Sequence, residues 1–383
     1  MNSNSKTIMK FGDVSPDYVI QVPYYKEPQV RNEDVYVPFG EANLFPNELI
    51  ELIEQSVSAT AILNGTMEMI KNYEITLNTK LPNYPYVNND NDTILDLVTH
   101  CAYDYFVFGE FFIQVIWNRL NKISELIHIP AEMVRMNLNR DKVYFNRFWT
   151  KFTSNNIEYN AFNPAQRKID EYSQVYVYSN GGHRRTYGLS SFSGCLNDIA
   201  AEVSASYYVK NSLDSGLASR FIISLPNSAN LTDDEKQDIE DSIREKFCGS
   251  KNAGAFMLYF NNDDSDLTVS KVDTDDSHER FKTIMEFTQS RIFTCLHTTP
   301  NLFGSPTQTT GFNTQEYQDA YNLYYKMTMA PCLNTISQAL NNIFGMDDAL
   351  TIETESKKQD DLINEDESKQ DDITTAQKET IEQ

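Results

Sequence analysis

The chain has 383 residues, of which 40% are hydrophobic and 12% aromatic, so it can bury the core of one elaborate domain or of two or three smaller ones. Its formal net charge is -23, and its sequence pI is about 4.6. Affinity for phosphates comes from Lys and Arg, so this charge excludes a general DNA-binding protein. An acidic wall can still surround DNA, because it repels the polyanion and keeps it from sticking.

Five cysteines are scattered along the chain without CxxC spacing, which predicts reduced, mostly buried thiols in a cytosolic protein. The N-terminal residues lack the apolar core of a signal peptide. No apolar run reaches the ~18 residues of a membrane helix, so we expect neither a transmembrane segment nor a membrane partner.

Residues 1–40 are polar and contain four prolines, which preclude one long helix. Two interpretations stay open for them: an extended N-terminal arm that lies on a neighbouring surface, or a terminus without fixed structure.

Residues 41–187 predict an α+β domain. Apolar residues at helical spacing favour a helical stretch over 41–72 and a further helix over 93–105. Patterns typical of β-strands follow at 106–119, 122–129, 143–148 and 174–178. Residues 150–173 carry no strong pattern. We therefore expect helices together with an antiparallel sheet.

Residues 188–217 predict a long helix with one apolar stripe. A helix of ~30 residues would be ~45 Å long, whereas ~11–12 residues are usual. Such a helix commonly packs against copies of itself, and the alternative is a single helix that crosses a large monomer core. Residues 274–298 predict a second long helix.

A β-α-β pattern lies between these two helices, over 218–273. Its strands are predicted at 221–225, 255–260 and 267–272. Thr232 and Glu235 have the spacing of a capping box, which predicts the start of the intervening helix. The insert is too small to bury much core alone, and packing against copies in an oligomer would solve that problem.

A polar Gly/Pro/Thr stretch, 299–313, precedes a helix over 314–345. Pro331 lies inside the helical pattern and predicts a kink or break near Met329, and Gly345 is the expected terminator. From Glu353 to Gln383 there are 11 acidic and 4 basic residues, so we expect 346–383 to form an acidic disordered tail.

The search for chemistry finds no motif for a phosphate-binding loop, a dinucleotide site, a metalloprotease or a serine hydrolase. Gly181–Arg185 is open to two interpretations, an anion site or a plain turn, and the acidic stretch around His278 to a metal site or a solvated helix start. Cys295 and His297 are expected to point to different sides of a helix, which argues against a nucleophilic pair. We expect no catalytic residue, no metal and no cofactor.

The order of several short motifs resembles that of tailed-bacteriophage portal proteins of the siphovirus type. The resemblance covers residues 38–345. The motifs are PFG at 38–40, NLFP at 43–46, VFGEFF at 107–112, YGLSSF at 187–192, NSLDSG at 211–216, LTDDE at 231–235, GSKNAG at 249–254, LHTTPNLFG at 296–304, GFNTQE at 311–316 and AP at 330–331. The chain is short after Gly345, which implies a reduced crown, and the acidic tail has no counterpart in the family.

The resemblance implies a portal fold with this domain map: 1–40 arm, 41–187 wing, 188–217 and 274–298 stem helices, 218–273 clip, 299–313 tunnel loop, and 314–345 kinked tunnel helix with a short crown. It implies a homo-oligomeric ring, a dodecamer, at one capsid vertex of the virion, assembled in the host cytoplasm. The expected partners are the terminase large subunit, a head–tail connector or adaptor, major capsid and scaffold proteins, and double-stranded DNA bound without sequence preference.

The resemblance further implies that the ring is the channel for DNA during packaging and ejection and the docking site for terminase and connector. The tunnel loop would supply the contacts with DNA in this channel. The expected residues are Gln308, Thr309, Thr310, Phe312 and Asn313, which are uncharged and would guide the duplex by shape. Lys282 and Arg291 have two possible roles, contact with phosphate or salt bridges between subunits. Two other classes of function remain open: a structural head–tail adaptor, and a cytosolic α+β enzyme whose site the sequence does not reveal.

Overall fold

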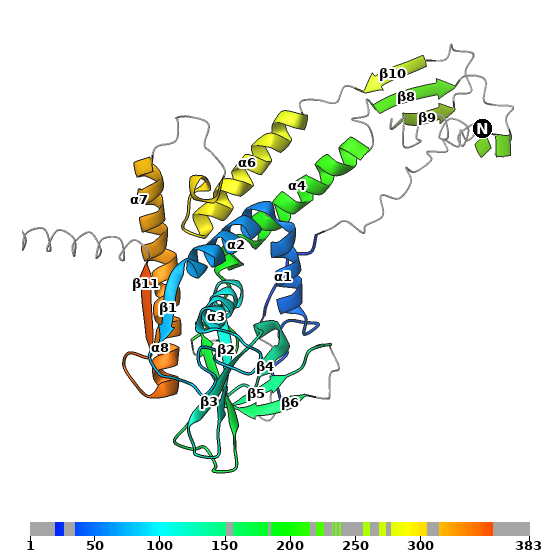
Figure 1. Cartoon of the computed structure of the whole chain (residues 1–383). Helices are drawn as coiled ribbons and strands as arrows, with labels where there is room; N and C mark the ends of the chain where they lie inside the picture. The colour runs from blue at the N-terminus through cyan, green and yellow to red at the C-terminus, as the bar shows by residue number, and fades with distance from the viewer. Residues whose placement is uncertain are drawn as a thin grey trace, which may run out of the picture. The chain divides into compact units, whose positions relative to one another are not determined.

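The computed structural model describes residues 20–26, 35–150, 156–182, 185–214, 220–225, 256–260, 268–272, 277–304 and 314–354, with 232, 234–235 and 237–238 (Figure 1). Contacts divide the chain into a larger unit, Val22–Leu196 with Ile292–Gln383, and a smaller unit, Met1–Gln21 with Asn197–Arg291. Within the described residues, no helix is both long enough and apolar enough to cross a membrane.

Three helices open the larger unit: α1 (Phe45–Gln55), α2 (Val57–Lys71) and α3 (Ile94–Phe108). The helical stretch predicted over 41–72 is two helices, because Ser56 adopts an extended conformation and its hydroxyl caps α2 by accepting from the Ala59 amide at 3.1 Å. The strand predicted from residue 106 begins later. Phe106–Phe108 belong to α3, which ends at Gly109 in the left-handed conformation.

A three-stranded antiparallel sheet follows, with β2 (Glu110–Trp117) between β3 (Ile123–Ile129) and β7 (Ser173–Ser179). Phe111 and Phe112 of β2 are fully buried, as the α+β prediction requires. A second sheet contains β4 (Val134–Met136), β5 (Lys142–Phe145) and β6 (Ile157–Asn160). The sequence did not predict β4 or β6, because each has only three or four residues.

Strands β1 (Tyr73–Leu77) and β11 (Leu350–Thr354) form a two-stranded sheet. Strand β11 lies within the segment that was predicted to be a disordered tail. The strands pair antiparallel, with Tyr73 opposite Thr354. The prediction that 346–383 are disordered is therefore wrong for β11. Its β-branched residues favour a strand, but the acidic composition of the whole segment outweighed them in the prediction. Residues 355–383 lie outside the described residues.

The predicted irregularity in the third long helix is confirmed. Helix α7 (Thr314–Tyr324) passes into a π-helical turn (Tyr325–Met329) and then directly into α8 (Ala330–Phe344). Pro331 falls in the first turn of α8, where its missing N–H costs least, and the π turn accommodates it without a break. Gly345, with φ of 65°, ends α8 as expected.

The described part of the N-terminal arm packs on its own chain. Tyr25 is buried and its ring meets those of Phe39, Phe45 and Tyr187, while Phe39 stacks on Tyr187 with ring centroids 3.9 Å apart. For these residues neither a neighbouring surface nor an unstructured terminus is the right description. The reason is that aromatic rings of residues that are distant in sequence pack against one another.

Arg135 is buried beneath this aromatic cluster. Its guanidinium donates to the side-chain and main-chain oxygens of Asn43 at 2.6 and 2.7 Å and to the carbonyl of Val134 at 2.7 Å, and it lies 4.8 Å from the Trp149 ring centroid. Burial lowers the pKa of Arg135 to about 10, which leaves it charged at neutral pH. Carbonyl oxygens thus replace the water that a buried cation loses.

The smaller unit contains α4 (Leu196–Asp214) except its first residue, the strands β8 (Arg220–Leu225), β9 (Phe256–Phe260) and β10 (Thr268–Val272), and α6 (Ser277–Cys295) up to Arg291. Strands β8 and β9 pair in parallel and β10 joins β8 antiparallel, in agreement with the β-α-β pattern. The capping box is confirmed: the Glu235 carboxylate accepts from the Thr232 amide at 2.8 Å. Helices α4 and α6 have 19 residues each, about 28 Å.

The first long helix therefore begins at Leu196, not at Gly188. A Cβ on Gly188 would stand 2.6 Å from the backbone of Phe108 and Gly109, and the Gly188 amide donates to the buried Glu110 carboxyl at 2.7 Å. This close approach holds the segment in the larger unit. A 3-10 turn, Ser191–Gly194, then precedes the helix.

Candidate functional site

The five residues expected to contact DNA, Gln308, Thr309, Thr310, Phe312 and Asn313, lie outside the described residues. The structure does describe both flanks of their segment. On one side a 3-10 turn, Pro300–Phe303, ends at Gly304 with φ of 84°, and on the other side α7 begins at Thr314. The segment 305–313 is called the channel segment below, and its flanks define what can be built of the site.

The Phe303 ring anchors the first flank on α2. A Cβ on Gly65 would stand 2.6 Å from this ring, so only glycine leaves room for it at that position. The ring also lies edge-on to Tyr324, with centroids 5.6 Å apart.

The second flank is tied to the same helix. The Tyr324 hydroxyl and the Thr66 hydroxyl form a buried hydrogen bond of 2.6 Å. Phe303 and Tyr324 thus meet each other and α2, which gives the channel segment a fixed base. Gly65 could not be recognised from the sequence, since nothing near it in the chain shows that a distant ring packs there.

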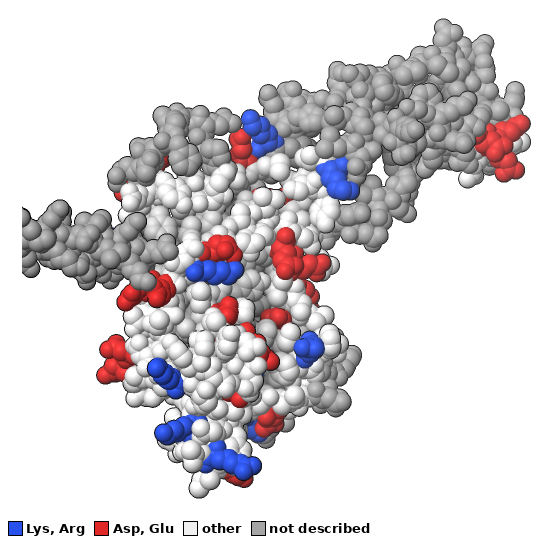
Figure 2. All heavy atoms as spheres, in the orientation of Figure 1, with Lys and Arg blue, Asp and Glu red and all other residues white. Residues whose placement is uncertain are grey.

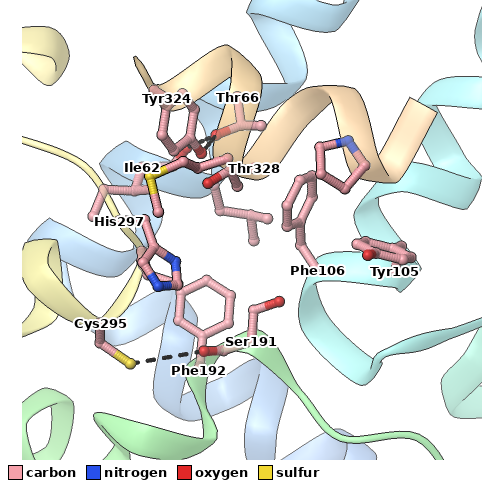
Figure 3. Close-up of a pocket in the computed structure, with 14 residues that line it drawn as sticks. Ile62, Thr66, Tyr105, Phe106, Ser191, Phe192, Cys295, His297, Tyr324 and Thr328 are labelled. Carbon is pink, nitrogen blue, oxygen red and sulfur yellow. Dashed lines mark hydrogen bonds between the residues drawn. The ribbon is translucent and has the colours of Figure 1, made fainter. Parts of the chain in front are cut away.

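A cavity of about 230 Å³ lies beside this base (Figure 3). Its walls come from α2, α3, the 3-10 turn at 191–194, the end of α6 and the π turn. The Thr328 hydroxyl is buried without a hydrogen-bond partner, and Thr328 lines the cavity. Empty space on one side lowers the cost of repacking the π turn, since fewer contacts must be broken.

Cys295 and His297 both line this cavity, although they were expected on different sides of a helix. The reason is that α6 ends at Cys295 and His297 turns back with φ of 55°. The Cys295 thiol contacts the Ser191 carbonyl at 3.8 Å as a weak donor (Figure 3).

Metal-binding side chains are dispersed over the described residues. Across the described part of the chain, no cluster of three or more His, Cys, Asp or Glu residues is placed to hold a metal ion. The side chain of His278 lies outside the described residues. At the turn after β7, the carbonyls of Gly182 and Arg185 accept hydrogen bonds from Arg140. Carbonyls that face a cation favour the plain turn over an anion site.

The two candidate cations of α6 have partners within the chain. Arg291 Nε lies 2.8 Å from the Asp198 carboxylate, which joins α6 to α4, and its guanidinium lies 5.5 Å from the Phe287 ring centroid. Lys282 Nζ lies 3.8 Å from Glu286 one turn along the same helix. Arg291 therefore forms an intrachain ion pair, a role that the sequence did not suggest.

Apolar side chains of the same two helices face solvent in the single chain. On α6, Phe287 is 60% exposed and Ile284 44%. On α4, Tyr207, Tyr208 and Val209 are exposed as well. Most of the predicted stripe is buried within the chain, as at Ile199, Val203 and Ile292. The exposed side chains are apolar residues of the same helices, and an exposed apolar patch of this kind marks an interaction surface.

Glu110 is a further buried ionisable residue that the sequence did not indicate. Its Oε2 accepts from the Gly188 amide, and its Oε1 is buried without a hydrogen-bond partner. Burial raises the pKa of Glu110 to about 8, against the opposing effect of Arg140 and Arg135. At neutral pH the carboxyl is protonated, and its hydrogen bond with the Gly188 amide joins β2 to the segment that leads to α4.

Comparisons with known proteins identify related chains. The family model described as phage portal protein matches residues 58–374. A chain in the virion of a native gene transfer agent particle is 15% identical, with a TM-score of 0.55 and coverage of 86% of this chain and 89% of that one. An HK97 family phage portal protein from Corynebacterium diphtheriae is 11% identical, with a TM-score of 0.53 and coverage of 83% and 98%.

A chain in the neck of a native gene transfer agent particle, computed with C12 symmetry, is 14% identical, with a TM-score of 0.52 and coverage of 80% of this chain and 84% of that one. At such identities these similarities establish the fold. No curated protein matches the chain.

Proposed function

The chain belongs to the phage portal protein family, and from this premise we propose that its copies form a dodecameric ring at one capsid vertex. DNA passes through the channel of this ring during packaging and ejection. The ring is part of the virion and assembles in the host cytoplasm.

The observation that carries this proposal is the exposed apolar surface of α4 and α6. Phe287, Ile284 and Tyr208 stand in solvent in the single chain, and burial of such side chains stabilises by ~1.5–3 kcal/mol each. Side-by-side copies of the helix pair would bury them. The similarity to a neck chain computed with C12 symmetry supports the number twelve.

We assign the parts of the portal with the bounds that the structure gives. The α+β part of the larger unit is the wing, α4 and α6 are the stem, the sheet β8–β10 belongs to the clip, and α7, the π turn and α8 are the kinked tunnel helix and short crown. The clip is the docking site for the terminase large subunit and then for a head–tail connector. The wing faces capsid and scaffold proteins.

The channel segment supplies the DNA contacts. Gln308, Thr309, Thr310, Phe312 and Asn313 are uncharged, so they guide the duplex by shape. The net charge of -23 keeps the channel wall from holding DNA tightly. The ion pair with Asp198 favours a structural role for Arg291 over contact with phosphate. The role of the chain is structural, without catalysis.

Electron microscopy and mass measurement of the purified protein, with scaffold and capsid protein present, test the ring. A strict monomer under these conditions would contradict the proposal. A head–tail adaptor would also form a ring, so the position of the channel segment must be determined as well. In a portal, residues 305–313 lie at the narrowest point of the channel.

Deletion of residues 305–311 tests the channel segment itself. We expect rings to assemble, because the anchors at Phe303 and Tyr324 remain, whereas DNA packaging or retention is impaired. A Gly/Ser replacement of the same length is the matched control, which separates the length of the segment from its side chains. Normal packaging by the deletion would reject the assignment.

A further inference from the structure

One region of this acidic chain is basic. Residues 118–172 contain nine Lys or Arg and six Asp or Glu, whereas the whole chain contains 32 and 55. Figure 2 shows several of these cations gathered at the lower end of the larger unit, where Figure 1 places the β2–β3 hairpin. A local reversal of charge on a chain of -23 is a feature that recognition of an acidic partner requires.

The sheet brings two basic loops to this end. Strands β2 and β7 are antiparallel, with Ile116 opposite Ser173, so the turn 118–122 and the loop 163–172 lie side by side. The Trp117 amide donates to the Tyr172 carbonyl at 2.9 Å, and the Arg167 guanidinium lies 4.5 Å from the Trp117 ring centroid. The basic tip is defined as the residues that these two loops present: Arg119, Leu120, Lys122, Arg167, Lys168 and Ile169.

Large apolar side chains stand among these cations. Leu120 is 79% exposed and Ile169 is 94% exposed. Phosphates would pair with the cations but could not form apolar contacts with Leu120 and Ile169. The tip therefore fits a peptide that carries both carboxylates and aliphatic side chains.

The acidic residues of the two loops do not cancel the charge of the tip fully. Glu171 accepts from the Asn160 side chain at 2.8 Å and from the Lys168 amide at 3.4 Å, so its carboxylate is engaged with its own surroundings. Four cations face two acids, Asp170 and Glu171, over the two loops.

We propose that the basic tip binds the acidic segment 355–383 of this chain, from the same copy or from a neighbouring one. This segment contains ten Asp or Glu and four Lys, and its stretch 360–367 (DDLINEDE) sets Leu362 and Ile363 between carboxylates. It carries the negative charge that complements the cations of the tip, and aliphatic side chains that can pack on Leu120 and Ile169. The inference concerns the wing and its tail, and it stands whether or not the chain forms a ring.

The reach of the segment permits this contact. It follows Thr354, the last residue of β11, which pairs with Tyr73 in the larger unit. Its 29 residues span up to ~100 Å when extended. A unit of ~240 residues has a radius of gyration of only about 18 Å. While the segment occupies the tip, other acidic partners must displace it, and salt weakens its hold.

Zero-length carbodiimide cross-linking of the full chain, analysed by mass spectrometry, tests the contact. We expect Lys122 and Lys168 to be joined to carboxylates of 360–372, in a yield that falls as salt rises. Lys282, whose side chain is 68% exposed, is the reference lysine and is expected to react with these carboxylates several-fold less.

Charge variants sharpen the test, because they leave the reacting lysines and carboxylates in place. Arg119→Glu is expected to lower the yield of the Lys168 cross-link roughly threefold. The matched control is Arg147→Glu, an exposed position outside the tip, which is expected to leave the yield unchanged. Equal loss in both variants would overturn the proposal, since the effect would then be one of net charge.

Three further outcomes would also overturn it. The first is reaction of the segment with Lys282 as readily as with Lys122 and Lys168. The second is cross-linking of the tip lysines to another protein in assembled particles and never to 355–383, which would give the tip a different acidic occupant. The third is binding of short duplex DNA to the full chain that Arg119→Glu abolishes, which would make the tip a phosphate site.

Discussion

The α+β part of the larger unit and the helix pair α4–α6 differ in the burial of their apolar residues. In β2, Phe111, Phe112 and Ile113 are fully buried within one chain. In α6, Phe287 remains 60% exposed. The first region is complete as a monomer, whereas in the proposed ring the second is completed by neighbouring copies. Folding and assembly therefore depend on different residues, and substitutions can separate them.

The largest expected loss of stability comes from Arg135→Met in the α+β part. Removal of the guanidinium takes a charged donor from the main-chain oxygens of Asn43, Glu132 and Val134. We expect the free energy of unfolding to fall by about 3–5 kcal/mol, measured by denaturant titration. Arg119→Met, on the exposed hairpin, is the control and should change it by less than about 0.5 kcal/mol. Similar values for both variants would mean that Arg135 does not stabilise the fold.

Glu110→Gln tests how the buried Glu110 carboxyl makes the stability of the chain depend on pH. Burial raises the pKa of Glu110 from 4.5 to about 8 in the folded chain, so between these values the folded state holds a proton that the unfolded state loses. Stability contributed by this proton is present below pH 4.5 and is lost as pH rises toward 8. Glutamine cannot ionise, so the stability of the variant relative to the native chain should rise by a few kcal/mol from pH 5 to pH 8.

Thermal unfolding of the two proteins at several pH values measures this difference. Parallel pH profiles would show that Glu110 does not keep its proton in the folded chain.

The ion pair between Arg291 and Asp198 is expected to contribute less. The Arg291 side chain is 55% exposed, so solvent screens the pair, and a double-mutant cycle with Arg291→Gln and Asp198→Asn should give a coupling of ~0.2–1 kcal/mol. Zero coupling would favour the two roles that the sequence suggested for Arg291, contact with phosphate or with a neighbouring subunit.

The smallest effect on the single chain is expected from Phe287→Glu. Because Phe287 is exposed, the stability of the unassembled chain should change by less than about 0.5 kcal/mol. A charge in the surface between copies should nevertheless prevent ring formation, which mass photometry would detect. Phe148→Glu is the matched control: Phe148 is 78% exposed on the larger unit, and its variant should still form rings. Normal rings with Phe287→Glu would place the subunit interface elsewhere.

Short-range patterns in the sequence determined much of this protein. The α+β class, the strands β8–β10, the capping box of Thr232 and Glu235, the irregularity near Pro331 and the stop at Gly345 all follow from residues a few positions apart. Their physical basis is local, since hydrogen bonds of caps and turns join neighbours in the chain. The family resemblance also came from motifs of this length.

Contacts between distant residues were decided only by the tertiary structure. Gly188 is held against Gly109, so α4 begins at Leu196. The pairing of β11 with β1 turned part of the predicted tail into a strand. For the site, the sequence indicated the channel segment, but the fit of Phe303 over Gly65 could not be predicted. No local pattern encodes which side chains meet across hundreds of residues, because that choice is made by packing of the whole core.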